Sequence, residues 1–137
     1  MVVDDVQVPL VLPAWLEPFD RDLERTVDRL RGRSLTRLDR PLTPGVPGVP
    51  TAAQATRDLA QRLADDAARL EGHPSHPVPP VDIHVLPDLL AVVGHDLALA
   101  LSRFDDPDSK VADAVGSTPR ERAARVVGAL VGLRHAL

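Results

Sequence analysis

The sequence lacks cysteine and tyrosine, and it contains one tryptophan, two phenylalanines and a single lysine in 137 residues. The absence of cysteine excludes disulfides, thiolate catalysis and zinc sites built on cysteine. With only 2% aromatic residues, the chain has no stacking platform for nucleic-acid bases. The formal net charge of −4 also argues against a nucleic-acid-binding domain, which normally has a basic face.

Several motifs are missing as well. We find no glycine-rich phosphate loop, no dinucleotide fingerprint and no nucleophile elbow, so we expect no cofactor and no complete catalytic site. We find no run of about 18 apolar residues, from which we expect no membrane-spanning helix. The start of the chain, Met1 to Leu12, has no basic residue of the kind that opens a signal peptide. We therefore predict a cytoplasmic protein.

The composition that is present, with 44% hydrophobic and 26% charged residues, is that of one globular domain. Apolar residues recur every three or four positions, which predicts an all-α fold of four main helices in an antiparallel bundle. We expect one helical domain over residues 14–137. Residues 1–13 are expected to form an extended arm, because Pro9 and Pro13 forbid a central strand.

Start and stop signals place the helices. Thr51 follows a proline and is a good N-cap, and Thr118, Pro119 and Glu121 form a capping box with proline at the first helical position. The expected helices cover about residues 14–31, 51–70, 86–104 and 118–137. Proline-rich connections join them at 33–50 and 72–85, and the first is long enough to cross between the ends of the bundle.

Two helices have unusual compositions. The helix expected over 86–104 has almost no polar face, so we expect neighbouring helices or a second subunit to bury it all round. The last helix carries Gly128 and Gly132, four residues apart. This spacing lets backbones approach closely. We predict that it serves tight packing inside the bundle, with a contact between subunits as the alternative.

Five histidines are the main candidates for metal or pocket chemistry. His73, His76 and His84 lie in or near one loop, and with Asp82 or Asp88 they are chemically adequate zinc ligands. Exposed loop histidines with no metal are the alternative, because a proline-broken loop is not a rigid frame.

His95 and Asp96 lie in the middle of the most apolar helix. An unpaired polar group there costs about 1–3 kcal/mol. Two interpretations remain open: a hydrogen-bonded core or helix-edge histidine, and a residue of a ligand pocket.

Arginines of the last helix form another candidate site. Arg120, Arg122 and Arg125 lie on its first turns, and together with Arg134 they are candidates for holding an anion. The alternative is a solvated face balanced by nearby acids. On the second helix, we expect Arg62–Asp66 and Asp65–Arg69 pairs on the outer surface.

Parts of two helices resemble the DinB-like superfamily, which includes mycothiol-dependent maleylpyruvate isomerases. The second helix of that family often reads Trp-Thr-Val-Arg-Asp before a metal-binding histidine. Residues 56–60, which read Thr-Arg-Asp-Leu-Ala, match part of this run. Gln54 occupies the tryptophan position and Arg62 occupies the position of the ligand histidine.

In the third helix of the family, a ligand histidine shortly precedes Asp-Leu. Here Val93 occupies that position, and His95 lies two residues later, about 200° around the helix. The resemblance covers about 60 residues and implies a four-helix bundle that has lost its metal ligands. It suggests a ligand pocket near His95, Asp96, Arg57 and Arg62.

Three functions follow as hypotheses. The first is a non-catalytic helical protein that acts through its surface, as a homodimer or with a protein partner, without cofactor, nucleic acid or membrane. The alternative is a DinB-like metal- or thiol-dependent enzyme, or a binder of small ligands with a pocket near His95. The third is anion or nucleic-acid binding by the arginines of the last helix.

Overall fold

The computed structural model describes residues 12–109 and 117–137, and in these residues it is all-α with no β-strand. The expected fold class is therefore confirmed, whereas most of the predicted arm lies outside the described residues. The helices are α1 (Glu17–Arg31), α2 (Leu35–Leu38), α3 (Ala52–Leu70), α4 (Leu86–Ser102) and α5 (Pro119–Ala136). Short 3₁₀ turns, Ala14–Leu16 and Ile83–Val85, lead into α1 and α4.

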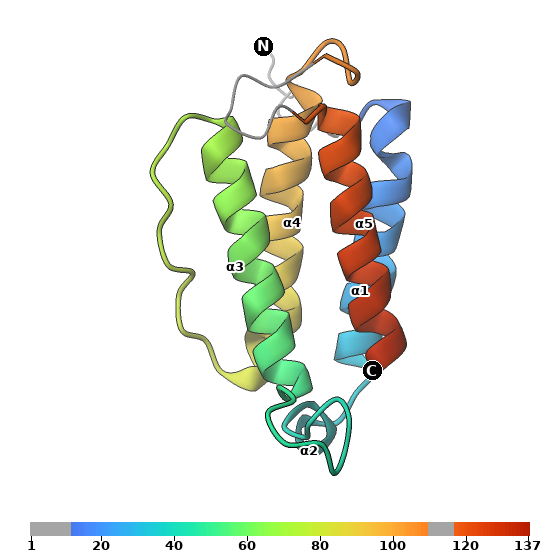
Figure 1. Ribbon diagram of the computed structural model, residues 1–137, viewed down its shortest axis with the longest axis vertical. Coiled ribbons are helices and arrows are strands. Elements are labelled where there is room, and N and C mark those ends of the chain that lie inside the picture. The colour runs from blue at the N-terminus through green and yellow to red at the C-terminus, as the bar shows by residue number, and fades with distance from the viewer. Residues whose placement is uncertain (1–11, 110–116) are drawn as a thin grey trace, which may run out of the picture.

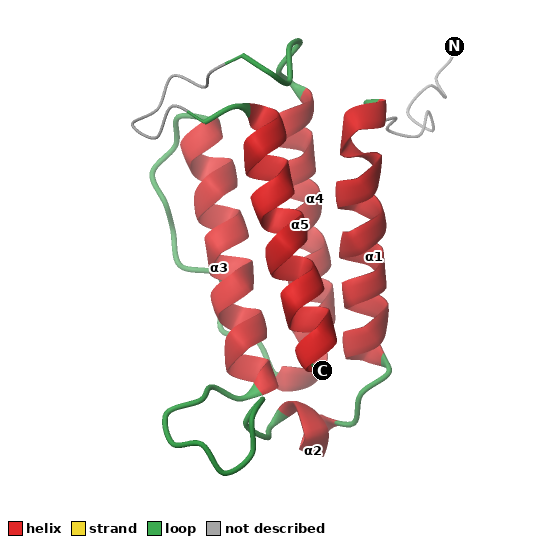
Figure 2. Ribbon diagram, turned by 45° about the vertical axis from the view of Figure 1, so that its right-hand side comes forward, coloured by secondary structure: helices red, strands yellow, loops and turns green. Residues whose placement is uncertain are grey.

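The four long helices lie alongside one another, and α2 lies below their ends (Figures 1 and 2). In Figure 1, α1 and α5 run downwards and α3 and α4 run upwards. Thr26 of α1 contacts Leu130 of α5. Further along both segments, Arg37 of α2 contacts Leu137. The chain therefore runs in the same direction through α1 and α5. Two neighbouring pairs, α1–α4 and α3–α5, are antiparallel, and the pairs α1–α5 and α3–α4 are parallel. The expectation of a uniformly antiparallel arrangement is thus corrected.

The two long connections explain these directions. The chain between α1 and α3 stays at one end of the molecule, where it contains α2, so it does not make the expected crossover. The chain between α3 and α4 runs back along the outside of the helices (Figure 1). The 19 residues of α3 span about 28 Å. An extended proline-rich chain covers that distance with about nine residues, at about 3.1 Å each.

Side chains of α3 hold this returning segment in place. Gln61 donates from Nε2 to the His76 carbonyl at 3.0 Å, and its Oε1 accepts the Val78 N–H at 2.8 Å. Arg57 donates to the Val81 carbonyl at 3.2 Å. A segment with four prolines has few backbone donors of its own. Its position therefore depends on these side-chain contacts.

Local signals place the helix starts as predicted. Thr51 and Gln54 form a reciprocal capping box at α3, and Thr118 and Glu121 form another at α5. Each box satisfies two backbone N–H groups that have no partner inside the helix.

The core consists of leucine and alanine stripes from all four long helices. The largest fully buried apolar side chains are Leu16, Phe19, Leu23, Leu30, Leu38, Leu63, Leu86, Leu90, Leu97, Leu101 and Leu130. At the crossing of α1 and α4, Gly94 lies directly against Leu23. A Cβ atom added at Gly94 would lie 2.6 Å from both terminal carbons of Leu23. The close approach of these two helices therefore favours glycine at this position, since any larger residue would force the Leu23 side chain to shift.

Helix α4 is less completely covered than its composition predicts. Its inner face is buried, but Val92 is 59% exposed and the neighbouring His95 and Asp96 are also exposed. Neighbouring helices of the same chain therefore cover only part of this helix, and burial of the exposed side by a second subunit stays a prediction.

The segment Ile83–Ser102 has 20 residues and a mean hydropathy of 1.5, and half of it is buried in the protein. By length and composition alone it is apolar enough to cross a membrane, although it is not an uninterrupted apolar run, since it contains His84, Asp88, His95 and Asp96. Core helices of soluble proteins have the same property.

The glycines of α5 also differ from the prediction. Both Gly128 and Gly132 are exposed, and a Cβ atom added at either would meet nothing within 4 Å. They do not serve close packing inside the described protein, and the alternative of a contact between subunits remains.

Candidate functional site

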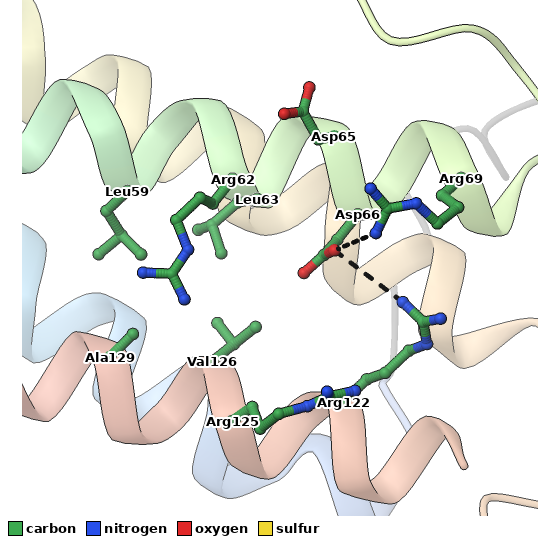
Figure 3. Close-up of a pocket in the computed structure, with 10 residues that line it drawn as sticks. All are labelled: Leu59, Arg62, Leu63, Asp65, Asp66, Arg69, Arg122, Arg125, Val126 and Ala129. Atoms are coloured by element: carbon green, nitrogen blue, oxygen red, sulfur yellow. Dashed lines mark hydrogen bonds and ion pairs between the residues drawn. The ribbon is translucent and has the colours of Figure 1, made fainter. Parts of the chain in front are cut away.

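A cleft of about 300 Å³ separates α3 from α5 (Figure 3). Its floor is apolar and its rim is charged. The described lining residues are Leu59, Arg62, Leu63, Asp65, Asp66 and Arg69 from α3 and Arg122, Arg125, Val126 and Ala129 from α5. The two helices run in opposite directions, so residues 62–69 face residues 122–129.

Positive charge predominates in the cleft. Four arginines line it, against two aspartates. Of these, Asp65 is on the side of α3 that faces away from α5 (Figure 3), where it accepts a hydrogen bond from Gln61 at 2.9 Å. Asp66 is therefore the only carboxylate among the described lining residues that points towards α5. Four guanidinium groups and one carboxylate leave a local excess of positive charge.

Asp66 connects the two helices at one end of the cleft. Its Oδ1 lies 3.2 Å from Arg69 Nη1 and 3.9 Å from Arg122 Nη1. One carboxylate oxygen is thus shared by two guanidinium groups, and the contact across the cleft is the longer one. A shared carboxylate compensates each cation only in part.

Arg122 is the most deeply placed charge, with only 4% of its side chain exposed. Burial lowers the pKa of its guanidinium, the carboxylate of Asp66 acts in the opposite direction, and Arg125 and Arg69 lower the pKa further. Arginine nevertheless stays charged in proteins. The cleft therefore keeps a desolvated cation at its inner end, where a negatively charged ligand would be favoured.

Arg62 and Arg125 complete the charged rim. Arg62 extends from α3 towards α5, above Val126 and Ala129 (Figure 3), and within the described residues it has no hydrogen-bond or ion-pair partner. Arg125 donates to the Ser117 hydroxyl at 3.0 Å, a neutral acceptor. Neither cation is neutralised by a carboxylate in the part of the chain that the structure describes.

The structure separates the four arginines that the sequence suggested as an anion site. Arg122 and Arg125 line the cleft. Arg120 donates to Asp108 at 2.9 Å and lies 6.0 Å from the ring centre of Trp15. Arg134 donates from Nη2 to Asp22 at 3.0 Å, in a half-buried ion pair with α1.

The predicted pocket near His95 is also divided. His95 and Asp96 are exposed on α4, and no described interaction joins them to α3. Arg57 contacts the returning segment, whereas Arg62 lines the cleft. Arg62 is therefore the one member of this predicted set that belongs to the site described above.

The loop histidines do not form a metal site. His73, His76 and His84 are all exposed. Throughout residues 12–109 and 117–137, no three side chains from histidine, cysteine, aspartate and glutamate lie close enough together to hold a metal ion. The proline-rich segment is extended, which keeps these histidines apart.

The sequence analysis did not predict the charged contacts that Asp66 makes in the cleft. Arg62 and Asp66 were expected to pair on an outer surface, but Asp66 pairs instead with Arg69 and reaches Arg122. The available signal was the spacing of Arg62, Asp66 and Arg69, which places all three on one face of a helix next to an apolar stripe. That signal could not show that α5 would bring two more arginines to the same face.

Comparisons with protein-family models, with curated proteins and with solved structures find no match to this chain. The resemblance to the DinB-like superfamily therefore rests on the sequence motifs alone, and the site is interpreted from its own geometry.

Proposed function

We propose that this protein is a non-catalytic helical protein that binds a small organic anion in the cleft between α3 and α5. The observation that supports this proposal is the charge of the cleft, which four arginines line with one inward-pointing carboxylate, Asp66, shared by Arg69 and Arg122. Guanidinium groups match the geometry of carboxylates and phosphates. The described lining contains no serine, cysteine, histidine or lysine, and its inward-pointing carboxylate, Asp66, is engaged by Arg69 and Arg122.

The floor of the cleft suggests that the anion has an apolar part. Leu59, Leu63, Val126 and Ala129 line it between the arginines. The hollow continues beyond Leu59, Arg62 and Ala129 into a second space of about 360 Å³, towards Leu133. A ligand with a charged group near Arg122 and an apolar chain along this groove would match both surfaces.

Octanoate is a suitable first probe, because it has one carboxylate and a short apolar chain. Isothermal titration calorimetry measures its binding to the wild type and to the Arg62→Gln and Arg125→Gln variants. We expect each variant to bind about tenfold more weakly, because a hydrogen bond to a charged group contributes about 1.5–3 kcal/mol. Arg21→Gln, an exposed arginine of α1 outside the cleft, is the matched control. No octanoate binding, or equal binding by all four proteins, would refute the proposal.

We further propose that the protein forms a homodimer through the outer face of α5. Gly128 and Gly132 support this, because a Cβ atom added at either would meet nothing within 4 Å in the described chain; Gly132 also borders the second space next to the cleft, so the dimer contact would adjoin that space. A two-fold axis near the middle of α5 would place each glycine pair against its own copy. Light scattering after size exclusion tests this directly. We expect a dimer mass for the wild type and a lower mass for Gly128→Gln. A monomer mass for the wild type across the micromolar range would exclude the dimer.

We keep the expectation that the protein acts in the cytoplasm, with neither nucleic acid nor a membrane as its partner. The net charge of −4 supports the first part, since polyanions are repelled by an acidic protein. A gel-shift titration with double-stranded DNA at low salt measures this, and binding that weakens with salt would contradict the expectation.

A further inference from the structure

A second cavity, of about 230 Å³, lies at the opposite end of the protein from Arg122. It is formed where α2 and the chain around it meet the start of α3 and the end of α5. The described lining residues are Arg33, Arg37, Leu38, Arg40, Pro41, Leu42, Pro44, Ala52, Ala136 and Leu137.

The charge of this cavity is more one-sided than that of the cleft. Three arginines line it, and no aspartate or glutamate occurs among its described lining residues. Arg37 donates from Nη2 to the main-chain oxygen of Leu137, at a long 3.4 Å. Even if a full negative charge is assigned to Leu137, two of the three guanidinium charges have no counter-charge in the lining.

Arg33 is the least well accommodated of the three. Its Nε atom is buried and has no hydrogen-bond acceptor among the described residues. Burial, together with the charges of Arg29 and Arg37, lowers the pKa of its guanidinium. A buried donor without an acceptor is uncommon in folded proteins and calls for an explanation. One explanation is that a bound molecule supplies the acceptor for Arg33 Nε.

We propose that this cavity binds a multiply charged oxyanion, such as the phosphate group of a small phosphomonoester. The fork of donors on each guanidinium matches a tetrahedral oxyanion. Three cations in a described lining that has no aspartate or glutamate favour a dianion over a monocarboxylate, because each additional negative charge gains from all three. The apolar wall formed by Leu38, Leu42 and Ala52 can receive the organic part of an ester. This site is separate from the cleft and does not depend on the function proposed above.

Inorganic phosphate tests the proposal through thermal unfolding, followed by circular dichroism. The wild type is compared in phosphate and in chloride of matched ionic strength. We expect phosphate to raise Tm by about 2–4 °C more than chloride, because a ligand that binds only the folded state stabilises it. Acetate at the same ionic strength should give a clearly smaller rise, and an equal rise would overturn the assignment to a dianion.

Variants locate the effect. Arg37→Gln combined with Arg40→Gln should remove most of the phosphate-dependent rise, and both side chains are exposed enough to change without damage to the core. The pair Arg62→Gln and Arg125→Gln, in the cleft, and the control Arg21→Gln should keep it. If the Arg37/Arg40 variant keeps the full rise in phosphate, the proposal is wrong.

Arg33→Met separates binding from a purely structural role. If the half-buried Arg33 side chain is only an unfavourable charge, its removal raises Tm by the same amount in phosphate and in chloride. If it binds the anion, the difference between the two buffers shrinks. An unchanged difference therefore overturns the role of Arg33, and if this variant fails to fold, the Arg37/Arg40 variant decides alone.

Discussion

The contact between Gly94 and Leu23 allows a sharp test of how α1 and α4 pack. Substitution of Gly94 by alanine places a Cβ atom 2.6 Å from both terminal carbons of Leu23 and 3.2 Å from its Cγ. Leu23 is 1% exposed, so its side chain cannot turn away into solvent. Overpacking of this kind costs about 1–3 kcal/mol. Alanine also gains about 1 kcal/mol over glycine in a helix, which partly offsets that cost.

Gly128→Ala is the matched control, because the same change in α5 meets nothing within 4 Å. The gain in helix propensity is common to both variants, so the difference in their free energies of unfolding isolates the overpacking at Leu23. We expect Gly94→Ala to be less stable than Gly128→Ala by about 1–3 kcal/mol. Urea unfolding of both variants at low micromolar concentration, where any dimer contributes least, measures this difference.

A second substitution checks the cause. Leu23→Ala alone should cost about 2–5 kcal/mol, because it leaves a cavity in the core. In the Gly94→Ala background the additional cost should be smaller, since the new methyl group occupies part of the space. Equal stability of the two glycine variants, or strict additivity in the double variant, would show that α1 and α4 are not in the close contact described.

Three further predictions concern polar contacts between helices. Asp66→Asn should lower the free energy of unfolding more than Arg122→Met, by about 1–3 kcal/mol, because the first removes a carboxylate that Arg69 and the buried Arg122 share and the second leaves Asp66 paired with Arg69. Chemical unfolding of both variants gives the order, and the reverse order would contradict it. Gln61→Ala removes two hydrogen bonds to the segment between α3 and α4, so it should cost about 1–2 kcal/mol and speed proteolytic cleavage in that segment, whereas an unchanged cleavage rate would show that other contacts hold it. Asp22→Asn weakens a half-buried pair with Arg134 and should lower stability by about 1 kcal/mol at low salt, with Asp20→Asn, on the same helix, as the control.

The parts of the fold that follow local rules could be predicted from the sequence. Thr118 begins α5 with the capping box that the residue spacing indicated, and Thr51 is the N-cap of α3 as predicted. The buried stripes on α1 and α3 follow the period of 3.6 residues. Both the helix caps and the buried stripes depend on residues that lie within one or two helical turns of each other.

The directions of the helices could not be predicted in the same way. The first proline-rich connection was the one judged long enough to cross between the ends of the bundle, but it is the second that runs along the length of the helices. The second connection is held by Gln61 and Arg57 of α3, the helix just before it in the chain. These contacts form only when the connection folds back along that helix. Similarly, the exposure of Gly128 depends on which face of α5 meets α1 and α3, and that is a property of the assembled helices.

The placement of arginines supports the proposal that this protein binds a small anion rather than a large one. The chain is acidic overall, with 20 acidic against 16 basic residues, so it repels an extended polyanion at long range. Yet seven arginines line the two cavities, with two aspartates among the described lining residues. Concave sites with low-dielectric walls concentrate the potential of such charges, and salt screens them less than charges on an open surface. A small anion can enter these sites and gain from several guanidinium groups at once, whereas a nucleic acid would meet the acidic surface first.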